Sequence, residues 1–283
     1  KEVKGRIASV NNTRKITSAM KMVASAKLHK AQAAIESMLP YERRLHHILT
    51  DFMSNCTEVT SPFIVKREVK KVAVVVFASN TSLCGGFNAN VIRHLVDLLA
   101  EYKPLGLENI LVFPVGKKVA DAVRKLGFRI EGDFQHMADK PSYQEAADLA
   151  ADLMKRFLHG DVDKVELLYN HFKSTASQIL TRETYLPIDL NNEKKEEERT
   201  IDYILEPSAE ELMQEMLPKV LRMKMFTVLL DSNAAEHAAR TMAMQIATDN
   251  ANELLQELTV MYNKSRQQSI TNELLDIVGG SMA

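Results

Sequence analysis

The sequence predicts an α/β domain with a Rossmann-like, mostly parallel sheet, inserted between long N- and C-terminal helices that form an antiparallel coiled coil. Three observations lead to this fold class. Both ends of the chain carry apolar residues at helical spacing over about fifty residues or more, and the middle alternates short apolar runs with helical stretches. The composition has only 10 Gly, 8 Pro and no Trp beside 14 Met, which favours long helices over sandwiches or barrels.

The first predicted helix covers residues 2 to about 55. Alternating steps of three and four from Ile7 to Phe52 meet an apolar residue at ten of fourteen positions, which is a coiled-coil pattern. Pro40 lies inside this stretch, so we expect the helix to bend or restart there. Basic residues dominate positions 1 to 30, where Glu2 is the only acidic residue. Such an excess of positive charge indicates an acidic partner.

The middle of the chain, from about 66 to 206, predicts alternating strands and helices. Expected strands are 71–79, 109–116, 128–132, 164–172 and 175–188, and expected helices are 88–102, 117–126 and 142–159. This alternation is typical of a largely parallel sheet with right-handed crossovers. The last two runs are too close together for a crossover helix, so we expect them to pair antiparallel.

The third segment predicts one helix that runs to about residue 278 and contains Pro218. Steps of four and three from Leu212 to Leu275 give nineteen seam positions, of which twelve are apolar. The seven polar positions fall mostly in two clusters, and they are Lys219, Asn233, His237, Arg240, Ser265, Gln268 and Asn272. A buried helix seam does not tolerate such clusters without polar partners.

The unequal lengths of the two terminal helices predict a projecting end. At 1.5 Å per residue they span roughly 80 Å and roughly 105 Å, and we expect them to pair antiparallel on the same side of the α/β domain. Pairing that starts near residues 55 and 210 places Lys1 level with about residue 264. The polar cluster 265–272 and the apolar tip that follows then face other molecules. The predicted division is a shaft, 1–60 with 207–283, and a foot domain, 66–206.

No catalytic, cofactor or metal site is predicted. The stretch SLCGGFNANV, residues 82–91, follows a strand and opens a helix, so its glycines suit a phosphate cradle. The third glycine of a dinucleotide fingerprint and the G-x-x-x-x-G-K-[ST] motif are both missing, so a tight turn is favoured. A nucleotide-binding α/β enzyme with a coiled-coil arm stays as the alternative. Cys56 and Cys84 are too few for a disulfide framework, and the histidines lack metal-ligand spacing.

Neither a membrane span nor a nucleic-acid site is indicated. The longest apolar run, Val72 to Ala78, has seven residues, whereas a bilayer-spanning helix needs roughly 20. Nucleic-acid modules usually interleave aromatic residues with basic ones, and residues 1 to 40 contain no aromatic residue. A coiled-coil adaptor or nucleic-acid arm remains a second alternative to be tested.

Four segments resemble a known family. IASVNNTRKITSAMKMVASAKL (7–28), SLCGGFN (82–88), AARTMAMQIATDNA (238–251) and YNKSRQQSITNELLDIVGG (262–280) resemble the γ subunit of F-type ATP synthases, in matching order over nearly the whole chain. The resemblance implies the central-stalk rotor of a proton-translocating synthase, with no active site of its own. Its implied partners are the α and β subunits, the ε subunit and the membrane ring of c subunits. A bacterial source and the cytoplasmic face of the inner membrane are expected.

The same resemblance implies a set of partner contacts. Met20, with its neighbour Lys21, and Arg240 match positions where the family's shaft meets an acidic loop of the β subunit. Near the top, the matching contact positions are Arg266, Gln267, Thr271, Glu273, Leu274, Leu275, Ile277 and Val278, of which 274 to 278 form a tip that turns in an apolar sleeve. One departure is Asn80-Thr81-Ser82, where the family commonly has Asp-Arg-Gly, so a charged contact there is not expected to be kept.

Overall fold

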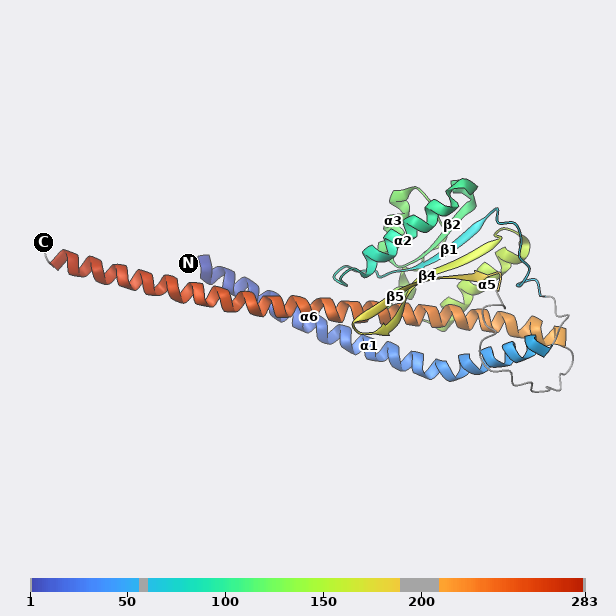
Figure 1. Cartoon of the computed structure of the whole chain (residues 1–283), viewed down its shortest axis with the longest axis horizontal. Coiled ribbons are helices and arrows are strands. Elements are labelled where there is room, and N and C mark those ends of the chain that lie inside the picture. Colours follow the sequence, from blue (N-terminus) through green and yellow to red (C-terminus); the bar gives the residue numbers. More distant parts are fainter. Residues whose placement is uncertain (1, 56–60, 189–208, 282–283) are drawn as a thin grey trace.

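The computed structural model describes residues 2–55, 61–188 and 209–281. Two long helices lie side by side, and an α/β unit formed by residues 61–188, called the foot domain below, sits against one end of the pair (Figure 1). Cys56 lies outside the described residues. The elements are α1 Glu2–Asn55, β1 Val72–Phe77, α2 Phe87–Tyr102, the 3-10 turns Lys103–Leu105 and Leu107–Asn109, β2 Ile110–Val115, α3 Lys117–Leu126, β3 Arg129–Ile130, α4 Gln135–Asp139, α5 Tyr143–His159, β4 Lys164–Ser174, β5 Ser177–Leu186 and α6 Ala209–Ser281.

The helices α1 and α6 pair antiparallel, as predicted, and side-chain contacts fix their register. Thr17 Oγ1 and Thr248 Oγ1 lie 2.8 Å apart, and Arg14 Nη1 donates a hydrogen bond to Asn252 Oδ1 at 3.4 Å. The two residue numbers of each pair add up to 265 or 266, so the start of α1 lies level with about residue 264. The register expected from helix lengths alone is therefore confirmed.

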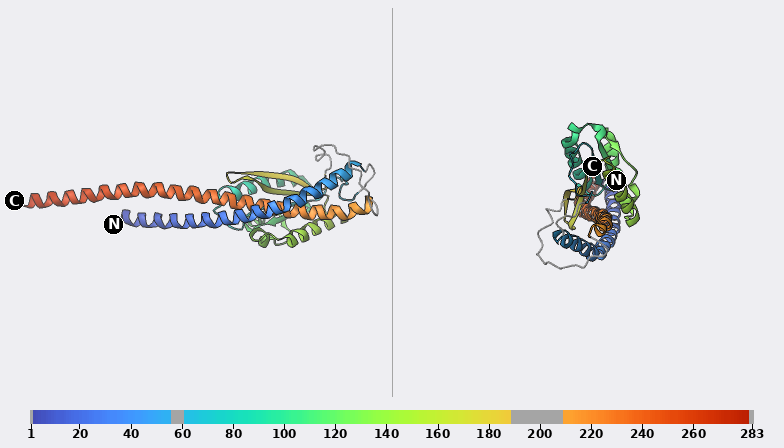
Figure 2. Two further views of the ribbon diagram at one scale, coloured as in Figure 1. Left: turned by 90° about the horizontal axis from the view of Figure 1, so that it is seen from below. Right: turned by 90° about the vertical axis from the view of Figure 1, so that its right-hand side faces the viewer.

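The end of α6 runs past the N-terminus of α1, and Figure 2 shows this overhang from below. Within the part of α6 whose side chains are described, which ends at residue 278, Leu258 is the last buried residue, and the side chains of residues 263 to 278 are all exposed. The overhang from 264 to 281 is roughly 26 Å long. Among the described helices, no stretch combines the length and apolarity that crossing a lipid bilayer requires.

Pro40 does not break α1, which stays a single helix from Glu2 to Asn55. In Figure 1 the second half of α1 curves back toward α6. Of the two outcomes expected at the proline, the bend is therefore found and the restart is not. A proline removes one helical hydrogen bond and crowds the preceding turn, which is a common cause of such curvature.

The foot domain contains one five-stranded sheet in the order β3-β2-β1-β4-β5. The first four of these strands are parallel, with Val74 opposite Val112 and Glu166, and β5 runs antiparallel to β4. This confirms the mostly parallel sheet and the antiparallel closing pair. The 3-10 turns and α4 were not predicted, because they are too short to show a helical period.

The two faces of the sheet bury different sets of helices. Val72, Val74 and Val76 of β1 pack with residues of α2 and α3, whereas Val75 and Phe77 on the other face pack with α5 and α6. Alternate residues of a strand point to opposite faces, so a continuous apolar run such as β1 fills both cores at once.

The first half of α6 belongs to the core of the foot domain. Its residues in that core include Met213, Leu217, Leu221, Met225 and Leu229, all at helical spacing and all buried. The same helix also pairs with α1, whose Ala34, Ile35 and Met38 pack against this core and whose Thr17 contacts Thr248 further along. Since α6 takes part in both packed units, the division into a shaft, 1–60 with 207–283, and a foot, 66–206, remains a prediction.

Truncation of Leu217 is expected to destabilise the chain. Leu217 is fully buried between α6 and the sheet, so Leu217→Ala should lower the free energy of unfolding by about 2–5 kcal/mol through lost burial and a cavity. Leu275→Ala, in the exposed overhang of the same helix, should change it by less than about 0.5 kcal/mol. Urea unfolding followed by circular dichroism measures both. Equal effects of the two variants would contradict the assignment of α6 to the foot core.

Candidate functional site: the joint of shaft and foot, and the projecting helix end

Polar contacts fasten α6 to the foot domain along residues 221 to 240. Nearest the start of the helix, the hydroxyl of Tyr185 on β5 donates to Leu221 O at 2.7 Å, and burial raises the pKa of this tyrosine, which keeps it protonated as a donor. Closer to solvent, Lys224 Nζ lies 3.2 Å from Glu183 Oε2 on the same strand. These contacts join α6 to the antiparallel edge of the sheet.

Further along α6, Asp231 holds the hairpin of β4 and β5. Its Oδ1 accepts a hydrogen bond from the backbone N–H of Phe172 at 2.8 Å, and its Oδ2 lies 2.6 Å from His171 Nδ1. Two residues later, Asn233 Nδ2 donates to the carbonyl of Ala138 on α4 at 2.9 Å. A carboxylate that accepts from a backbone N–H forms a charge-assisted and directional bond.

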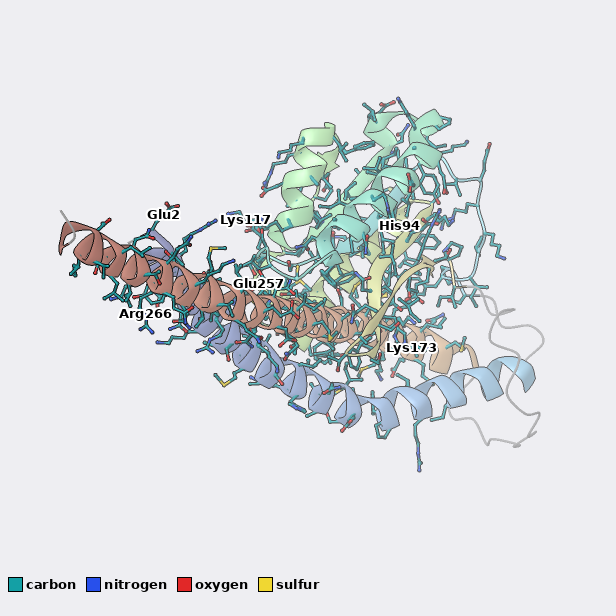
Figure 3. The ribbon with its side chains drawn as sticks, turned by 60° about the vertical axis from the view of Figure 1, so that its left-hand side comes forward. Glu2, His94, Lys117, Lys173, Glu257 and Arg266 are labelled. Carbon is teal, nitrogen blue, oxygen red and sulfur yellow. The ribbon has the colours of Figure 1, made fainter. Side chains whose placement is uncertain are left out.

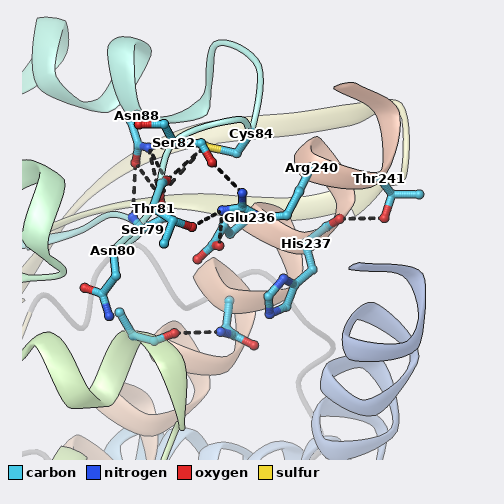
Figure 4. A network of polar contacts seen from close by, with 12 residues as sticks. Ser79, Asn80, Thr81, Ser82, Cys84, Asn88, Glu236, His237, Arg240 and Thr241 are labelled. Atoms are coloured by element: carbon cyan, nitrogen blue, oxygen red, sulfur yellow. Dashed lines mark hydrogen bonds and ion pairs between the residues drawn. The ribbon is translucent and has the colours of Figure 1, made fainter. Parts of the chain in front are cut away.

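Arg240 binds the turn that follows β1 (Figure 4). Its Nη1 donates to Ser82 O at 2.5 Å, and its Nη2 donates to Thr81 Oγ1 at 2.9 Å and to Glu236 Oε1 at 2.8 Å. The Arg240 residue is only 9% exposed, so a partner subunit has little access to it. The structure thus gives this guanidinium partners within the chain, and its predicted contact with another subunit stays a prediction.

The turn bound by Arg240 is tight and internally satisfied. Asn88 caps it, because Asn88 Oδ1 accepts from Ser79 N at 3.1 Å and Asn88 Nδ2 donates to Ser79 Oγ at 2.8 Å. Gly85 has φ of +59° and lies against Ala243 of α6, and Leu83 takes a positive φ of 68° that is rare for a leucine. These features agree with the predicted tight turn.

Cys84 in this turn lies among apolar residues, and its Sγ also accepts a hydrogen bond from Asn88 Nδ2 at 3.1 Å. It is buried with Phe87 and with Ala235 of α6, and it is a free thiol. The departure Asn80-Thr81-Ser82 also has a structural role. Asn80 Oδ1 accepts from Lys117 N at 2.8 Å, while Thr81 and Ser82 supply the acceptors for Arg240.

Burial controls the charges beside Arg240. Desolvation raises the pKa of Glu236, an effect that the hydrogen bond from Arg240 opposes. The pKa of His237 is lowered to about 4, first by burial and then by the positive charges of Lys27 and Arg240. Among the described residues, His237 Nδ1 has no hydrogen-bond partner. This imidazole is therefore neutral at physiological pH.

Phe172 brings the foot domain into contact with both shaft helices. Its side chain packs against a cluster formed by Leu28 and Ala31 of α1 with Ala234 and Ala238 of α6, and against a second cluster that contains Cys84 of the turn. Small alanines at this crossing let the two helices approach closely. The β4–β5 hairpin therefore contacts the shaft where α1 and α6 meet.

The predicted contact residues occupy two separate levels of the shaft. Met20 and Lys21 are half-buried on α1, and by the helix register they lie level with residues 244 and 245, roughly 7 Å along the axis from Arg240. All the others lie on the overhang, where Figure 3 labels Arg266. The exposed residues there are Arg266, Gln267, Thr271, Glu273, Leu274, Leu275, Ile277 and Val278.

The sequence did not predict the polar contacts that join α6 to the foot domain, called the joint here. Asn233, His237 and Arg240 stood out as a polar cluster in an apolar seam, but the periodicity did not say which neighbour they face. Asp231 and Glu236 lie off that seam and gave no signal of their own. Within the described residues, no group of histidine, cysteine or acidic side chains is arranged to hold a metal ion.

Comparison with known proteins identifies the family. A family model described as ATP synthase matches residues 1–283. An ATP synthase gamma chain of Phocaeicola vulgatus is 82% identical over 285 residues, and one of Bacteroides fragilis is 64% identical over 286 residues; each comparison covers 100% of this chain and 99% of the relative. The chain belongs to the ATP synthase gamma chain family. The resemblance noted in the sequence, including a bacterial relationship, is confirmed.

Solved structures support the gamma-chain fold. A chain in a structure of OSCP, F1 and the c-ring of the Euglena gracilis mitochondrial ATP synthase aligns with a TM-score of 0.66 at 22% identity, over 99% of this chain and 93% of that one. A chain in the central stalk and c-ring structure from Tetrahymena thermophila aligns with a TM-score of 0.58, also at 22% identity, over 82% of this chain and 99% of that one. At 22% identity, both alignments show a shared fold.

The lowered pKa of His237 predicts how stability depends on pH. An unfolded histidine binds a proton near pH 6.5 and the folded one only near pH 4, so the unfolded state gains protons first as the pH falls. The contribution of His237 to stability is therefore complete above pH 6.5 and declines down to about pH 4. His237→Gln should unfold with a flatter pH dependence across this window, measured as urea midpoints. Parallel curves for the two proteins would contradict the assignment.

Proposed function

We propose that this chain is the central-stalk rotor of a proton-translocating F-type ATP synthase and carries torque between the membrane c-ring and the catalytic β subunits. The observation that carries the proposal is the overhang of α6. Sixteen consecutive side chains, 263 to 278, are exposed on a helix whose earlier part is buried on several sides. A single helix of this length without a partner helix is marginal in water, so its stability is expected to come from a surrounding assembly.

The chemistry of the overhang suits a ring of subunits. Arg266 and Gln267 supply donors that grip acceptors on a partner loop, since a guanidinium forms directional bonds to carboxylates and carbonyls. Beyond them Leu274, Leu275 and Ile277 are each more than half exposed. An apolar surface without directional bonds has no single preferred angle, which suits a tip that turns inside an apolar sleeve.

Rotation couples to catalysis through differential contact. As the shaft turns, its unequal faces stabilise the open and closed forms of three β subunits in succession, and a partner shifts an equilibrium only by the difference in its affinity for the two states. Met20 and Lys21 are the proposed contacts near the base, with Arg266, Gln267, Thr271, Glu273 and residues 274 to 278 near the top. The nucleotide sites belong to the partner subunits, and this chain has no active site of its own.

The proposed location follows from the partners. The foot domain stands on the c-ring with the ε subunit, which places the chain on the cytoplasmic face of the bacterial inner membrane as a peripheral component.

Two alternative functions can be tested directly. Micromolar, stoichiometric binding of ATP or NAD in calorimetry of the isolated chain would favour a nucleotide-binding enzyme. Recovery with nucleic acid, rather than with α and β subunits, would favour an adaptor or nucleic-acid arm.

Arg266→Ala tests the grip at the overhang. Loss of a charge-assisted hydrogen bond costs about 1.5–3 kcal/mol, so the rotor should bind the catalytic ring about tenfold to a hundredfold more weakly. The matched control is Lys264→Ala, which removes an exposed cation two residues away. Association of each variant with the α and β subunits is measured by titration. Equal binding of the two variants would argue against Arg266 as a contact.

Met20→Lys tests the lower contact. A second cation beside Lys21 should bind the acidic loop too tightly for smooth turning, so fewer protons are pumped per ATP hydrolysed while the chain stays folded. Met22→Lys is the control, because residue 22 is exposed and points roughly 200° away around α1. Proton pumping and hydrolysis are compared in vesicles that contain the assembled synthase. Full coupling in Met20→Lys would remove this contact from the proposal.

A further inference from the structure

We infer that Asp231 and Arg240 are two opposed latches that fix the rotational position of the foot domain around α6, and that they are positioning residues for torque transmission. Each residue extends from α6 and binds backbone or side-chain groups of the foot domain at 2.5 to 2.9 Å. The inference deepens the proposed rotor function, because it states where torque passes between the two parts of the rotor.

The spacing of the two residues places them on opposite sides of the helix. Nine residues separate Asp231 from Arg240, which is two and a half turns of an α-helix, or roughly 180° around its axis. Asp231 is held by the β4–β5 hairpin through Phe172, and Arg240 is held by the turn after β1 through Ser82. Forces that the foot domain exerts on opposite sides of α6, at Asp231 and at Arg240, form a couple, which is a pure torque about the helix axis. Two attachments on one stripe would act as a hinge, whereas this pair resists rotation in both directions.

Both latches are directional, unlike the apolar contacts around them. Arg240 uses both terminal nitrogens of its planar guanidinium, so sliding of the turn by one ångström breaks two bonds at once. The carboxylate of Asp231 likewise uses both oxygens, one for Phe172 N and one for His171 Nδ1. Leucine and methionine side chains of the foot core hold α6 against the sheet, but apolar burial is non-directional and sets no angle.

The arrangement also explains why Arg240 is buried. Glu236, one helical turn before it, accepts from Nη2 and leaves Nη1 aimed at Ser82 O. The buried carboxylate of Glu236 stabilises the positive charge of the Arg240 guanidinium and restricts the arginine side chain to one conformation. The accepting groups on the turn are themselves positioned, because Asn88 Nδ2 donates to Thr81 O at 3.3 Å and to Ser79 Oγ at 2.8 Å. A rigid donor therefore meets a rigid acceptor.

The test measures the torsional stiffness of the rotor in the assembled synthase. The α and β subunits are fixed to a surface, a probe bead is attached to the foot through Lys125→Cys on α3, and the angular variance of the bead is recorded while rotation pauses. The variants are Asp231→Asn, and Glu236→Gln with Arg240→Met, which removes both members of the buried pair and leaves no unpaired charge. The matched control is Gln245→Ala, whose side chain donates hydrogen bonds to Asp249 of the same helix.

Each latch variant should raise the angular variance by up to about twofold, since one of the two opposed latches is lost while the bonds of Tyr185 to Leu221 and of Asn233 to Ala138 remain. The combination should exceed the sum of the two, because both latches act on one attachment of α6 to the foot domain. In Asp231→Asn, whose residue is not a proposed contact with the ring, ATP hydrolysis should stay at the control level. Variances equal to that of Gln245→Ala, or effects that merely add, would overturn the inference. If the combined variant does not assemble, the angular variance is compared for Asp231→Asn and Arg240→Lys instead. Lysine keeps the positive charge but cannot donate from two terminal nitrogens, so the same outcomes support or overturn the inference.

These outcomes separate this inference from the proposed function. If the bead does not rotate with ATP in the unmodified synthase, the rotor proposal fails whatever the variants do. If it rotates and the latch variants keep the stiffness of the control, the rotor proposal stands and the latch inference fails. Urea midpoints of the isolated variants report loss of folding, and a variant that unfolds early without any rise in angular variance counts against the latches.

Discussion

The structure depends on one constraint, which is that α6 cannot be covered along its length by any single neighbour. Its first half completes the apolar core of the foot domain, against which α1 also packs, its middle pairs with α1, and its last turns extend past the end of α1. The lengths of α1 and α6 and their register decide where along α6 the pairing with α1 ends and the overhang begins. Because one continuous helix passes through all three, a change of angle at the foot is carried to the overhang without a flexible connection.

Among the described residues, the buried side chains of Glu166, Glu236 and Arg240 each have an oppositely charged partner. Glu166 on β4 is a second example beside the latches. Burial alone would raise its pKa, but hydrogen bonds from Arg182, Lys164 and Tyr102 outweigh desolvation and hold the pKa below its ordinary value. This carboxylate ties the hairpin strands to α2 on the opposite face of the sheet from α6. The β4–β5 hairpin, which contacts the shaft, is therefore also held by α2 on the opposite face of the sheet.

Much of the fold was predictable because periodicity and helix rise are local properties. The bounds of α3 were predicted to the residue, the antiparallel β4–β5 pair followed from the short connection, and the register of α1 with α6 followed from their lengths. The joint was not predictable in the same way. A polar position in a seam reports that something polar lies opposite, but the identity of Ser82 O as the partner of Arg240 depends on tertiary packing. A backbone carbonyl is available at any residue, so the unusual Asn80-Thr81-Ser82 sequence gave no hint that the turn binds α6.

The most direct test of the rotor account is electron cryomicroscopy of the assembled synthase during ATP hydrolysis, with particles sorted by the angle of the shaft relative to the catalytic ring. The account predicts three principal angles, with the foot domain and α6 turning as one rigid body and residues 263 to 278 enclosed by the ring at each angle. A single angle in all particles, or residues 263 to 278 outside the ring, would contradict it.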